Sequence, residues 1–257
     1  MTAAVETGVI AVETKDIVKS FGSVQALRGV SITARAGEVT AIIGDNGAGK
    51  STLIKIIAGV DKADSGAVEL FGERVDFHSP EAARQAGIET VYQTLGLIED
   101  LAIWQNMFLN REQTVGFPPF RFMNKRAMRS EADRMMSELD VYIPSVKARI
   151  RGLSGGQRQA VAICRAAGWS SRVVIMDEPT AALGVRETAK VEELIQRLKS
   201  KGLAVIVISH NFDQVLRLSE QIWVMRQGSL IAGLRSAETN GDELVALITG
   251  AANAPRS

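Results

Sequence analysis

The sequence predicts an α/β fold with a parallel-sheet core, an antiparallel β subdomain at the N-terminal end and an inserted α-helical subdomain. Three observations support this class. Short apolar runs recur along the chain, an amphipathic helix lies between two of them, and the N-terminal part shows a different, alternating pattern. Strands buried on both faces of a parallel sheet have nearly continuous apolar sequences, whereas antiparallel strands more often alternate.

Four apolar runs are candidates for the parallel strands. They are Val39–Ile43, Val174–Met176, Leu203–Ile208 and Ile222–Met225. Between the second and third runs, four apolar residues follow the i, i+3, i+4, i+7 spacing of an amphipathic helix. These are Val191, Leu194, Ile195 and Leu198. Alternation of strands and helices is typical of a parallel sheet covered by helices.

The N-terminal region has a shorter, alternating strand pattern. It covers residues around 12–35 and 66–78, and Gly22, Gly37 and Gly72 break its strands. We therefore expect an antiparallel sheet beside the parallel one.

The central region lacks a strong strand signal. It contains helical stretches such as Asn124–Leu139, and Pro118, Pro119 and Pro144 interrupt it. We expect one domain over residues 8–250, with a helical subdomain at 93–167 inserted in it, and a loose C-terminal tail at 251–257.

Composition excludes several functional classes. Lys and Arg number 30 and Asp and Glu 29, which leaves a net charge of +1. Nucleic-acid binders usually carry a clear basic excess, so we expect no nucleic-acid partner. Because Cys164 is the only cysteine, a disulfide framework or a four-cysteine zinc site cannot form within one chain.

The sequence also bears on location. Its N-terminus has no basic start and no apolar core of a signal peptide. The longest apolar run, Leu203–Ile208, is far too short to span a bilayer. We expect a cytosolic chain whose membrane contact is peripheral or mediated by a partner.

A phosphate-binding loop follows the first parallel strand. The pattern G-x-x-x-x-G-K-[ST] is matched by Gly44, Asp45, Asn46, Gly47, Ala48, Gly49, Lys50 and Ser51, with Thr52 next. Glycines let backbone N–H groups surround phosphate oxygens, and the helix that follows adds positive potential. Lys50 is expected to reach the β- and γ-phosphates of a nucleotide, and Ser51 to bind Mg²⁺. The alternative is an ordinary glycine-rich turn, and the loop alone does not separate kinases, GTPases, helicases and transporters.

The run that begins at Val173 ends in two carboxylates, Asp177 and Glu178. Buried strands rarely end in adjacent acids without a cation or a reaction to serve. Asp177 suits the Mg²⁺ shell, and Glu178 is then placed to orient or deprotonate the attacking water. The alternative is a pair of solvated turn acids.

A second candidate anion site opens another helix. It consists of Ser154, Gly155, Gly156 and Gln157. Ser154 is a natural N-cap, and the glycines expose backbone N–H groups at the positive end of the helix. By itself this pattern is typical of a well-capped structural helix. Beside the phosphate-binding loop it favours a dimer, in which this site of one copy caps the nucleotide held by the other.

The ordered set of LSGGQ, an upstream phosphate-binding loop and a downstream Asp-Glu strand end resembles an ATP-binding-cassette (ABC) ATPase. The resemblance covers nearly the whole chain and implies a P-loop NTPase (RecA-like) core. It implies that Phe21 stacks on adenine, that Gln93 joins the Mg²⁺ shell and senses the transmembrane partner, and that His210 contacts the γ-phosphate. Lys50, Glu178 and His210 would be the catalytic residues.

One position departs from the family pattern. Where the family commonly reads SALD, this chain reads Ala181-Ala182-Leu183-Gly184. The missing aspartate helps the two nucleotide sites of the family communicate, so Gly184 puts that coupling in question.

The stretch HSPEAARQAGIETVYQTLGLIEDLAIWQNMFLNRE and the segment SGGQRQAVAICRA resemble monosaccharide importers. This resemblance implies the ATPase subunit of an importer for fructose, ribose or xylose, at the cytoplasmic face of the inner membrane. Its partners would be membrane-spanning permease subunits and, through them, a sugar-binding protein. The alternatives are an ABC ATPase for another cargo such as amino acids, or one that acts outside transport.

Two further features have two interpretations each. Trp104 is either a contact for the membrane subunits or a buried packing residue. The basic run Arg121, Lys125, Arg126 and Arg129 is interpreted as a solvated helix face rather than as a contact for lipid head groups.

Overall fold

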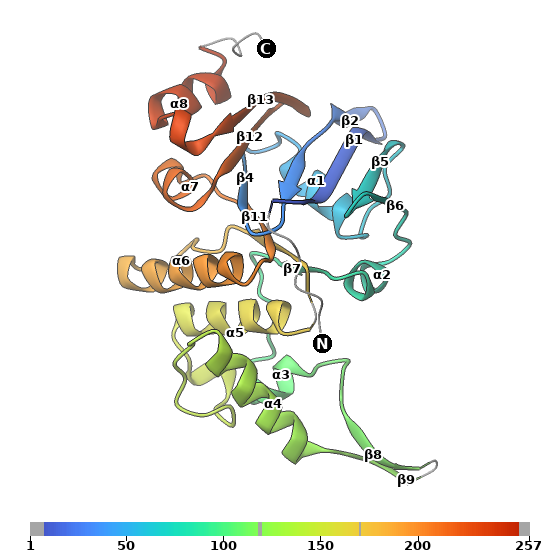
Figure 1. Cartoon of the computed structure of the whole chain (residues 1–257), viewed down its shortest axis with the longest axis vertical. Coiled ribbons are helices and arrows are strands. Elements are labelled where there is room, and N and C mark those ends of the chain that lie inside the picture. Colours follow the sequence, from blue (N-terminus) through green and yellow to red (C-terminus); the bar gives the residue numbers. More distant parts are fainter. Residues whose placement is uncertain (1–7, 118–119, 170, 252–257) are drawn as a thin grey trace. The chain divides into compact units, whose positions relative to one another are not determined.

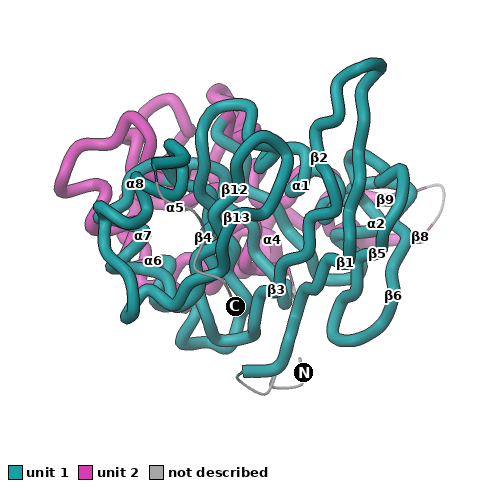
Figure 2. Tube along the Cα trace, turned by 90° about the horizontal axis from the view of Figure 1, so that it is seen from above, with its two compact units in different colours: residues 1–93, 170–179, 195–257 teal, residues 94–169, 180–194 magenta. Residues whose placement is uncertain are grey.

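The computed structural model describes residues 8–117, 120–169 and 171–251 (Figure 1). The chain forms two compact units, which Figure 2 distinguishes by colour. Unit 1 comprises residues 1–93, 170–179 and 195–257, and unit 2 comprises residues 94–169 and 180–194. Helix α6 (Val185–Ser200) runs from residues of unit 2 into residues of unit 1. Within the described ranges, no helix is both long and apolar enough to cross a membrane.

Unit 1 contains the predicted parallel sheet, with strands in the order β13-β12-β4-β11-β10-β7. All neighbours are parallel except the edge pair β12–β13. The strands are β4 (Val39–Ile43), β7 (Ile88–Val91), β10 (Val173–Asp177), β11 (Ala204–Ile208), β12 (Gln221–Arg226) and β13 (Ser229–Arg235). The four predicted parallel strands are confirmed. Two strands were not predicted from the sequence: β7, which is short and half polar, and β13, an antiparallel edge strand.

The N-terminal antiparallel sheet is also confirmed. Its order is β2-β1-β5-β6, and β3 pairs with β1. The strands are β1 (Ile10–Phe21), β2 (Val24–Val30), β3 (Thr33–Arg35), β5 (Ser65–Leu70) and β6 (Glu73–Val75).

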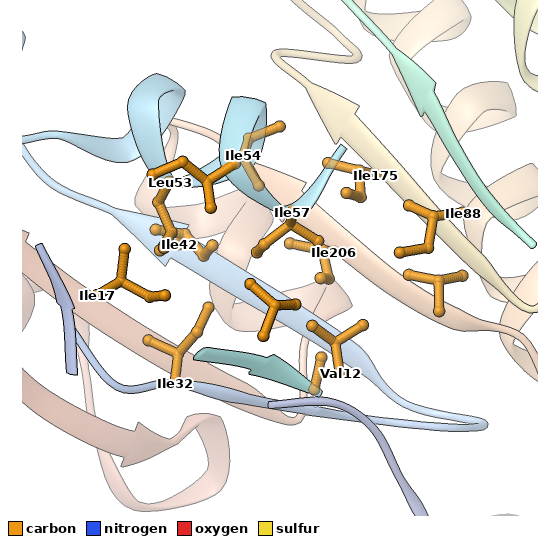
Figure 3. Packing of buried hydrophobic residues seen from close by; sticks show 14 of the residues in the cluster. Val12, Ile17, Ile32, Ile42, Leu53, Ile54, Ile57, Ile88, Ile175 and Ile206 are labelled. Atoms are coloured by element: carbon orange, nitrogen blue, oxygen red, sulfur yellow. The ribbon is translucent and has the colours of Figure 1, made fainter. Parts of the chain in front are cut away.

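The largest core of unit 1 lies between the two sheets and around α1 (Lys50–Ile57) (Figure 3). Leu53, Ile54 and Ile57 of α1 meet Ile42 of the parallel sheet and Ile17 of the antiparallel sheet, and each is at most 1% exposed. Full burial of such a side chain contributes about 1.5–3 kcal/mol to folding. The core therefore holds rigidly the helix that follows the phosphate-binding loop.

Three further helices belong to unit 1. They are α2 (Pro80–Gln85), α7 (Phe212–Leu218) and α8 (Gly241–Thr249), and a 3-10 turn covers Ser236–Glu238. A second core joins α7 and α8 to β4 and β12.

Unit 2 is mainly helical. It contains α3 (Ile103–Met107), α4 (Lys125–Glu138), α5 (Gly155–Ala167) and a 3-10 turn at Ile150–Gly152. Trp104 of α3 is 4% exposed, so packing is its role in this unit.

The expectation that the central region contains no strands is wrong in one place. Strands β8 (Thr114–Phe117) and β9 (Phe120–Met123) form an antiparallel ribbon. Valine and phenylalanine at every second position are the period-two signal of a strand. Pro118 and Pro119, expected to interrupt helices, lie outside the described residues.

Candidate functional site

The topology of unit 1 brings three strand ends to one edge of the parallel sheet. Strand β11 pairs in parallel with both β4 and β10, so Ile208 lies opposite Ile42 on one side and Asp177 on the other. The residues that follow these strands therefore emerge side by side. They are the phosphate-binding loop from Gly44, the acid pair Asp177 and Glu178, and the segment Ser209-His210. The carboxyl edge of a parallel sheet is where such folds bind ligands.

The phosphate-binding loop is held close to two other strands. Gly44 has a φ of 149°, and a Cβ there would lie 2.1 Å from the Met225 carbonyl oxygen of β12. Gly49 has a φ of 99°, and its Cβ would lie 2.7 Å from the Ala26 carbonyl oxygen of β2. Only glycine fits both positions, because each combines a left-handed backbone with contact to another main chain.

The first turn of α1 leaves its backbone amides available. Gly49 is the N-cap and offers no side-chain hydrogen bond. A helix normally satisfies these N–H groups with a capping side chain, water or a ligand. The arrangement therefore suits an anion at the start of α1.

Lys50 lies folded back over the loop. Its Nζ donates hydrogen bonds to the carbonyl oxygens of Gly44 at 2.6 Å and Asp45 at 2.9 Å. Burial lowers the pKa of Lys50, while Glu178, Asp177 and Asp45 act in the opposite direction. The amine is thus a partly desolvated donor that can exchange carbonyl oxygens for phosphate oxygens.

A cavity of about 510 Å³ opens on one side of this loop. Its lining joins the loop and the start of α1 to strand β2 and the turn after β12. The lining residues are Val24, Gln25, Ala26, Arg28, Asn46, Gly47, Ala48, Gly49, Lys50, Ser51, Thr52, Gln227 and Gly228. Phe21 is not among them, but it pairs with Val24 across the β1–β2 hairpin. Its half-exposed ring lies beneath the Lys19 amine, at 5.5 Å.

The two acids at the end of β10 have different surroundings. Burial, and then the neighbouring Glu178, raise the pKa of Asp177, although Lys50 partly offsets this. Glu178 has a left-handed φ of 52°, and its N–H donates to the Ile208 carbonyl oxygen at 2.9 Å. A non-glycine residue in this region is uncommon and marks a position that its surroundings constrain.

Glu178 and His210 are in direct contact. The Glu178 Oε1 lies 2.8 Å from the His210 Nδ1. The Glu178 side chain is 18% exposed and that of His210 76% exposed. The pair therefore links a shielded carboxylate to an imidazole on the open side of the site, a suitable arrangement for moving or orienting a proton.

Gln93 leaves the sheet at the same edge. It follows β7, whose Val91 lies opposite Met176 of β10. Gln93 is exposed. The part of the chain described here contains no cluster of three or more His, Cys, Asp or Glu side chains that could hold a metal ion.

The start of α5 in unit 2 is fully capped. The Ser154 Oγ accepts from the Gln157 N–H at 3.3 Å, and the Gln157 Oε1 accepts from the Ser154 N–H at 3.0 Å. The carboxylate of Glu187 accepts weakly from the N–H groups of Gly156 and Gly184, at 3.4 Å each. These contacts, with a hydrogen bond to Ser154 first, lower the pKa of Glu187. An anionic side chain thus lies at the N-terminus of α5.

Glu187 was not predicted from the sequence, and neither were two residues that hold the segment after Gln93. Fully buried Asn106 accepts from the Ile98 N–H at 2.7 Å and donates to the Ile98 carbonyl oxygen at 3.0 Å. Arg165 of α5 donates to the carbonyl oxygens of Leu95 and Gly96, each at 2.9 Å. A polar Asn106 among apolar residues was the available signal, because buried amides need partners.

The chain is similar to known proteins in both its sequence and its fold. The family model described as ABC transporter matches residues 27–181. The xylose/arabinose import ATP-binding protein XylG of Sulfolobus acidocaldarius is 48% identical, over 92% of this chain and 93% of its own length. The fructose import ATP-binding protein FrcA of Rhizobium meliloti is 44% identical, over 94% of this chain and 95% of its own length.

A third relative is longer. The ribose import ATP-binding protein RbsA of Chromobacterium violaceum is 40% identical over 92% of this chain, which spans only 46% of that relative.

Solved structures share the fold. The ADP conformation of MJ1267, an ATP-binding cassette of an ABC transporter, has a TM-score of 0.78 and 29% identity and covers 93% of this chain and 95% of its own. A dimeric, post-hydrolysis structure of the ATP-binding cassette MJ0796, bound to ADP and Pi, has a TM-score of 0.73 and 26% identity. It covers 88% of this chain and 98% of its own.

Proposed function

Because the chain belongs to the ABC transporter family, as an ATP-binding cassette, we propose that it hydrolyses ATP to drive import of a monosaccharide. One observation supports hydrolysis most directly: four polar side chains come together at one edge of the parallel sheet. They are Lys50, Asp177, Glu178 and His210. The cargo is inferred from relatives that import xylose or arabinose, fructose and ribose.

The chain's own residues account for the chemistry of hydrolysis. Backbone N–H groups of the glycine loop and the Lys50 amine hold the phosphates and offset the charge that develops during transfer. Glu178 orients the attacking water and accepts its proton, and His210 contacts the γ-phosphate while bonded to Glu178. The shielding of Glu178 favours a single orientation of its carboxylate.

The oxygen-bearing side chains at this edge of the sheet suit an Mg²⁺ ion that is also bound by phosphate oxygens. Mg²⁺ prefers oxygen ligands and usually completes its shell with water and phosphate oxygens. Ser51, Asp177 and Gln93 would supply oxygens, and the bound ion would neutralise phosphate charge. Nearby carboxyls at the partly buried end of β10 are suitable for a divalent cation, because a cation relieves the effects that raise the pKa of Asp177.

We infer that two copies act together. One copy would hold ATP on residues 44–52 and Phe21, and residues 154–157 of the other would close on the γ-phosphate. The dimeric fold relative bound to ADP and Pi supports this arrangement. ATP then shifts the population towards the closed pair, because it binds that state more tightly. For this to happen, the carboxylate of Glu187 must leave the N-terminus of α5.

The partners follow from the family. Membrane-spanning permease subunits would receive the motion, with a sugar-binding protein beyond them, and the chain would lie peripherally at the cytoplasmic face of the inner membrane. Gly184, in place of the family's aspartate, would weaken communication between the two nucleotide sites.

The test is Glu178→Gln with Glu238→Gln as the matched exposed control. We expect Glu178→Gln to lower the ATPase kcat at least about 100-fold, since it removes the base. The same variant should pass from monomer to dimer with Mg-ATP, as measured by light scattering. Glu238→Gln should retain full hydrolysis.

Cargo is tested separately, in proteoliposomes containing the permease. We expect a xylose-, fructose- or ribose-loaded binding protein to stimulate hydrolysis, and an amino-acid-binding protein to have no effect. Wild-type hydrolysis without sugar stimulation would overturn the cargo alone. Undiminished hydrolysis in Glu178→Gln would overturn the catalytic role, and a failure to dimerise would overturn the paired site.

A further inference from the structure

The ribbon β8–β9 of unit 2 has one wholly apolar face. Antiparallel partners directly opposite each other share a face, as do residues two apart on one strand. Val115 pairs with Phe122, and Phe117 with Phe120. These four side chains therefore point the same way, and they are 49%, 67%, 73% and 63% exposed in that order.

This face needs a partner. A two-stranded ribbon is marginally stable alone in water, and a contiguous exposed apolar patch marks an interaction site. Figure 1 shows the ribbon extending away from α3 and α4 of unit 2, and the exposure of its four apolar side chains shows that this face is uncovered. The opposite face, which carries Thr114, Gly116, Arg121 and Met123, is mixed.

Basic residues are concentrated in the segments that precede and follow the ribbon and within it. Residues 111–129 contain five basic side chains, Arg111, Arg121, Lys125, Arg126 and Arg129, against one acid, Glu112. The whole chain carries a net charge of only +1, so this excess is local.

A cavity of about 540 Å³ lies at the base of the ribbon, where Met123 contributes to its wall. Lys125, Arg129, Lys147 and Arg149 line it. Its one acid, Asp100, is bonded to Arg151 at 3.1 Å. The Arg129 guanidinium lies over the Trp104 ring at 5.1 Å, and its buried Nε has no hydrogen-bond partner among the described residues. The cavity thus gathers four cationic side chains, one of which has an unsatisfied Nε, at the base of the ribbon.

We propose that the β8–β9 ribbon inserts its apolar face into the surface of an anionic lipid bilayer, while the basic residues around it bind head-group phosphates. An apolar face flanked by Lys and Arg is the combination that holds proteins at anionic membrane surfaces. The apolar side chains carry no hydrogen-bonding group, so nothing on this face specifies a partner by polar contacts. The fluid hydrocarbon interior of a bilayer requires no such polar contacts.

The proposal goes beyond the proposed function, because none of its residues belongs to the nucleotide site. It revises the interpretation of the basic run as only a solvated helix face, since that run borders an exposed apolar ribbon. It gives the chain a membrane contact of its own, in addition to one made through a permease.

The test is sedimentation of the full chain with phosphatidylcholine vesicles, with and without phosphatidylglycerol. We expect binding only to the anionic vesicles, weakening as salt rises. Phe120→Ser/Phe122→Ser should lower the affinity at least about tenfold. Arg121→Gln/Lys125→Gln should lower it about 25-fold, because each cation near an anionic surface is worth about fivefold. Tyr142→Ser and Lys201→Gln, which change an exposed aromatic and an exposed cation elsewhere, are the matched controls.

Each variant's ATPase activity and thermal unfolding should match the wild type, which excludes misfolding as the cause of a loss. Absence of wild-type binding to anionic vesicles would overturn the proposal, as would equal binding by the phenylalanine variant. Binding only to vesicles that contain the permease would also overturn it and would assign the ribbon to a protein partner. If the wild type binds vesicles but hydrolyses no ATP, the proposed function alone fails.

Discussion

Asp177 and Lys50 show how individual residues of the nucleotide site are poised for a ligand. Burial raises the pKa of Asp177 and lowers the pKa of Lys50. In both cases the charged form is less stable in the folded chain than in water. A ligand that brings phosphate to Lys50 and a cation to Asp177 restores what desolvation removed, so the site favours ligand binding over its own stability.

We predict that Asp177→Asn stabilises the nucleotide-free chain near neutral pH, by on the order of 1 kcal/mol, while abolishing hydrolysis. The folded-state pKa of Asp177 is raised, so ionisation opposes folding once the pH passes the unfolded value of 3.8. The gain should therefore be full above the folded-state pKa and vanish as the pH falls towards 3.8.

Urea unfolding across this pH range measures the gain. Asp133→Asn, which changes an exposed acid of α4, controls for the loss of one negative charge and should leave stability nearly unchanged. A stabilisation that persists at the acidic end would contradict this account of Asp177.

At the scale of elements, α1 and α5 begin in opposite ways. Gly49 offers α1 no side-chain cap, whereas Ser154 and Gln157 form a complete capping box on α5. The first-turn amides of α1 are thus left for a ligand, and α5 is stable without one. In addition Glu187 lies at the N-terminus of α5.

We predict that Ser154→Ala and Asn240→Ala each destabilise the chain by about 1 kcal/mol, because each removes an N-cap. Asn240 caps α8, where it accepts from the Glu243 N–H at 3.0 Å. Only Ser154→Ala should also weaken the ATP-dependent pairing of Glu178→Gln, since Ser154 belongs to the proposed second phosphate site.

Denaturant midpoints of the two single variants measure the change in stability. Light scattering of each substitution combined with Glu178→Gln measures the ATP-dependent pairing. Equal losses of pairing in both variants would reduce Ser154 to a helix cap and remove it from the nucleotide site.

At the scale of the whole molecule, the two compact units carry different parts of the machinery. Unit 1 holds the phosphate-binding loop, the acid pair and His210, and unit 2 holds the start of α5 and the ribbon. ATP bound by a single, unpaired copy should therefore stabilise unit 1 rather than unit 2.

We predict that ATP at one hundred times its Kd stabilises unit 1 by about 2.7 kcal/mol, through mass action. At protein concentrations too low for pairing, amide hydrogen exchange should slow in β4, α1, β10 and β11 and stay unchanged in β8–β9. In Lys50→Ala the same ATP concentration should give little protection. Protection spread evenly over both units of monomeric protein would contradict this division.

Much of the fold followed from local patterns. Apolar runs such as Val39–Ile43 were sufficient, because a strand buried on both faces needs such a sequence whatever lies beside it. The β8–β9 ribbon was missed, since proline and charge obscured its short alternation. Strand β7 was missed because its polar residues gave no continuous run.

The sequence by itself determined which residues carry the chemistry, since spacing within one segment specifies the phosphate-binding loop, the acid pair and the cap of α5. Only the tertiary structure decided how they meet. Strand order, which no local pattern encodes, brings Glu178 to 2.8 Å from His210. Close packing, again a property of distant segments, makes Gly44 obligatory against Met225 and leaves the phenylalanines of β8–β9 uncovered within unit 2. These contacts join segments that are far apart in the sequence. Their energies depend on which segments become neighbours in the fold, and local sequence patterns do not specify that.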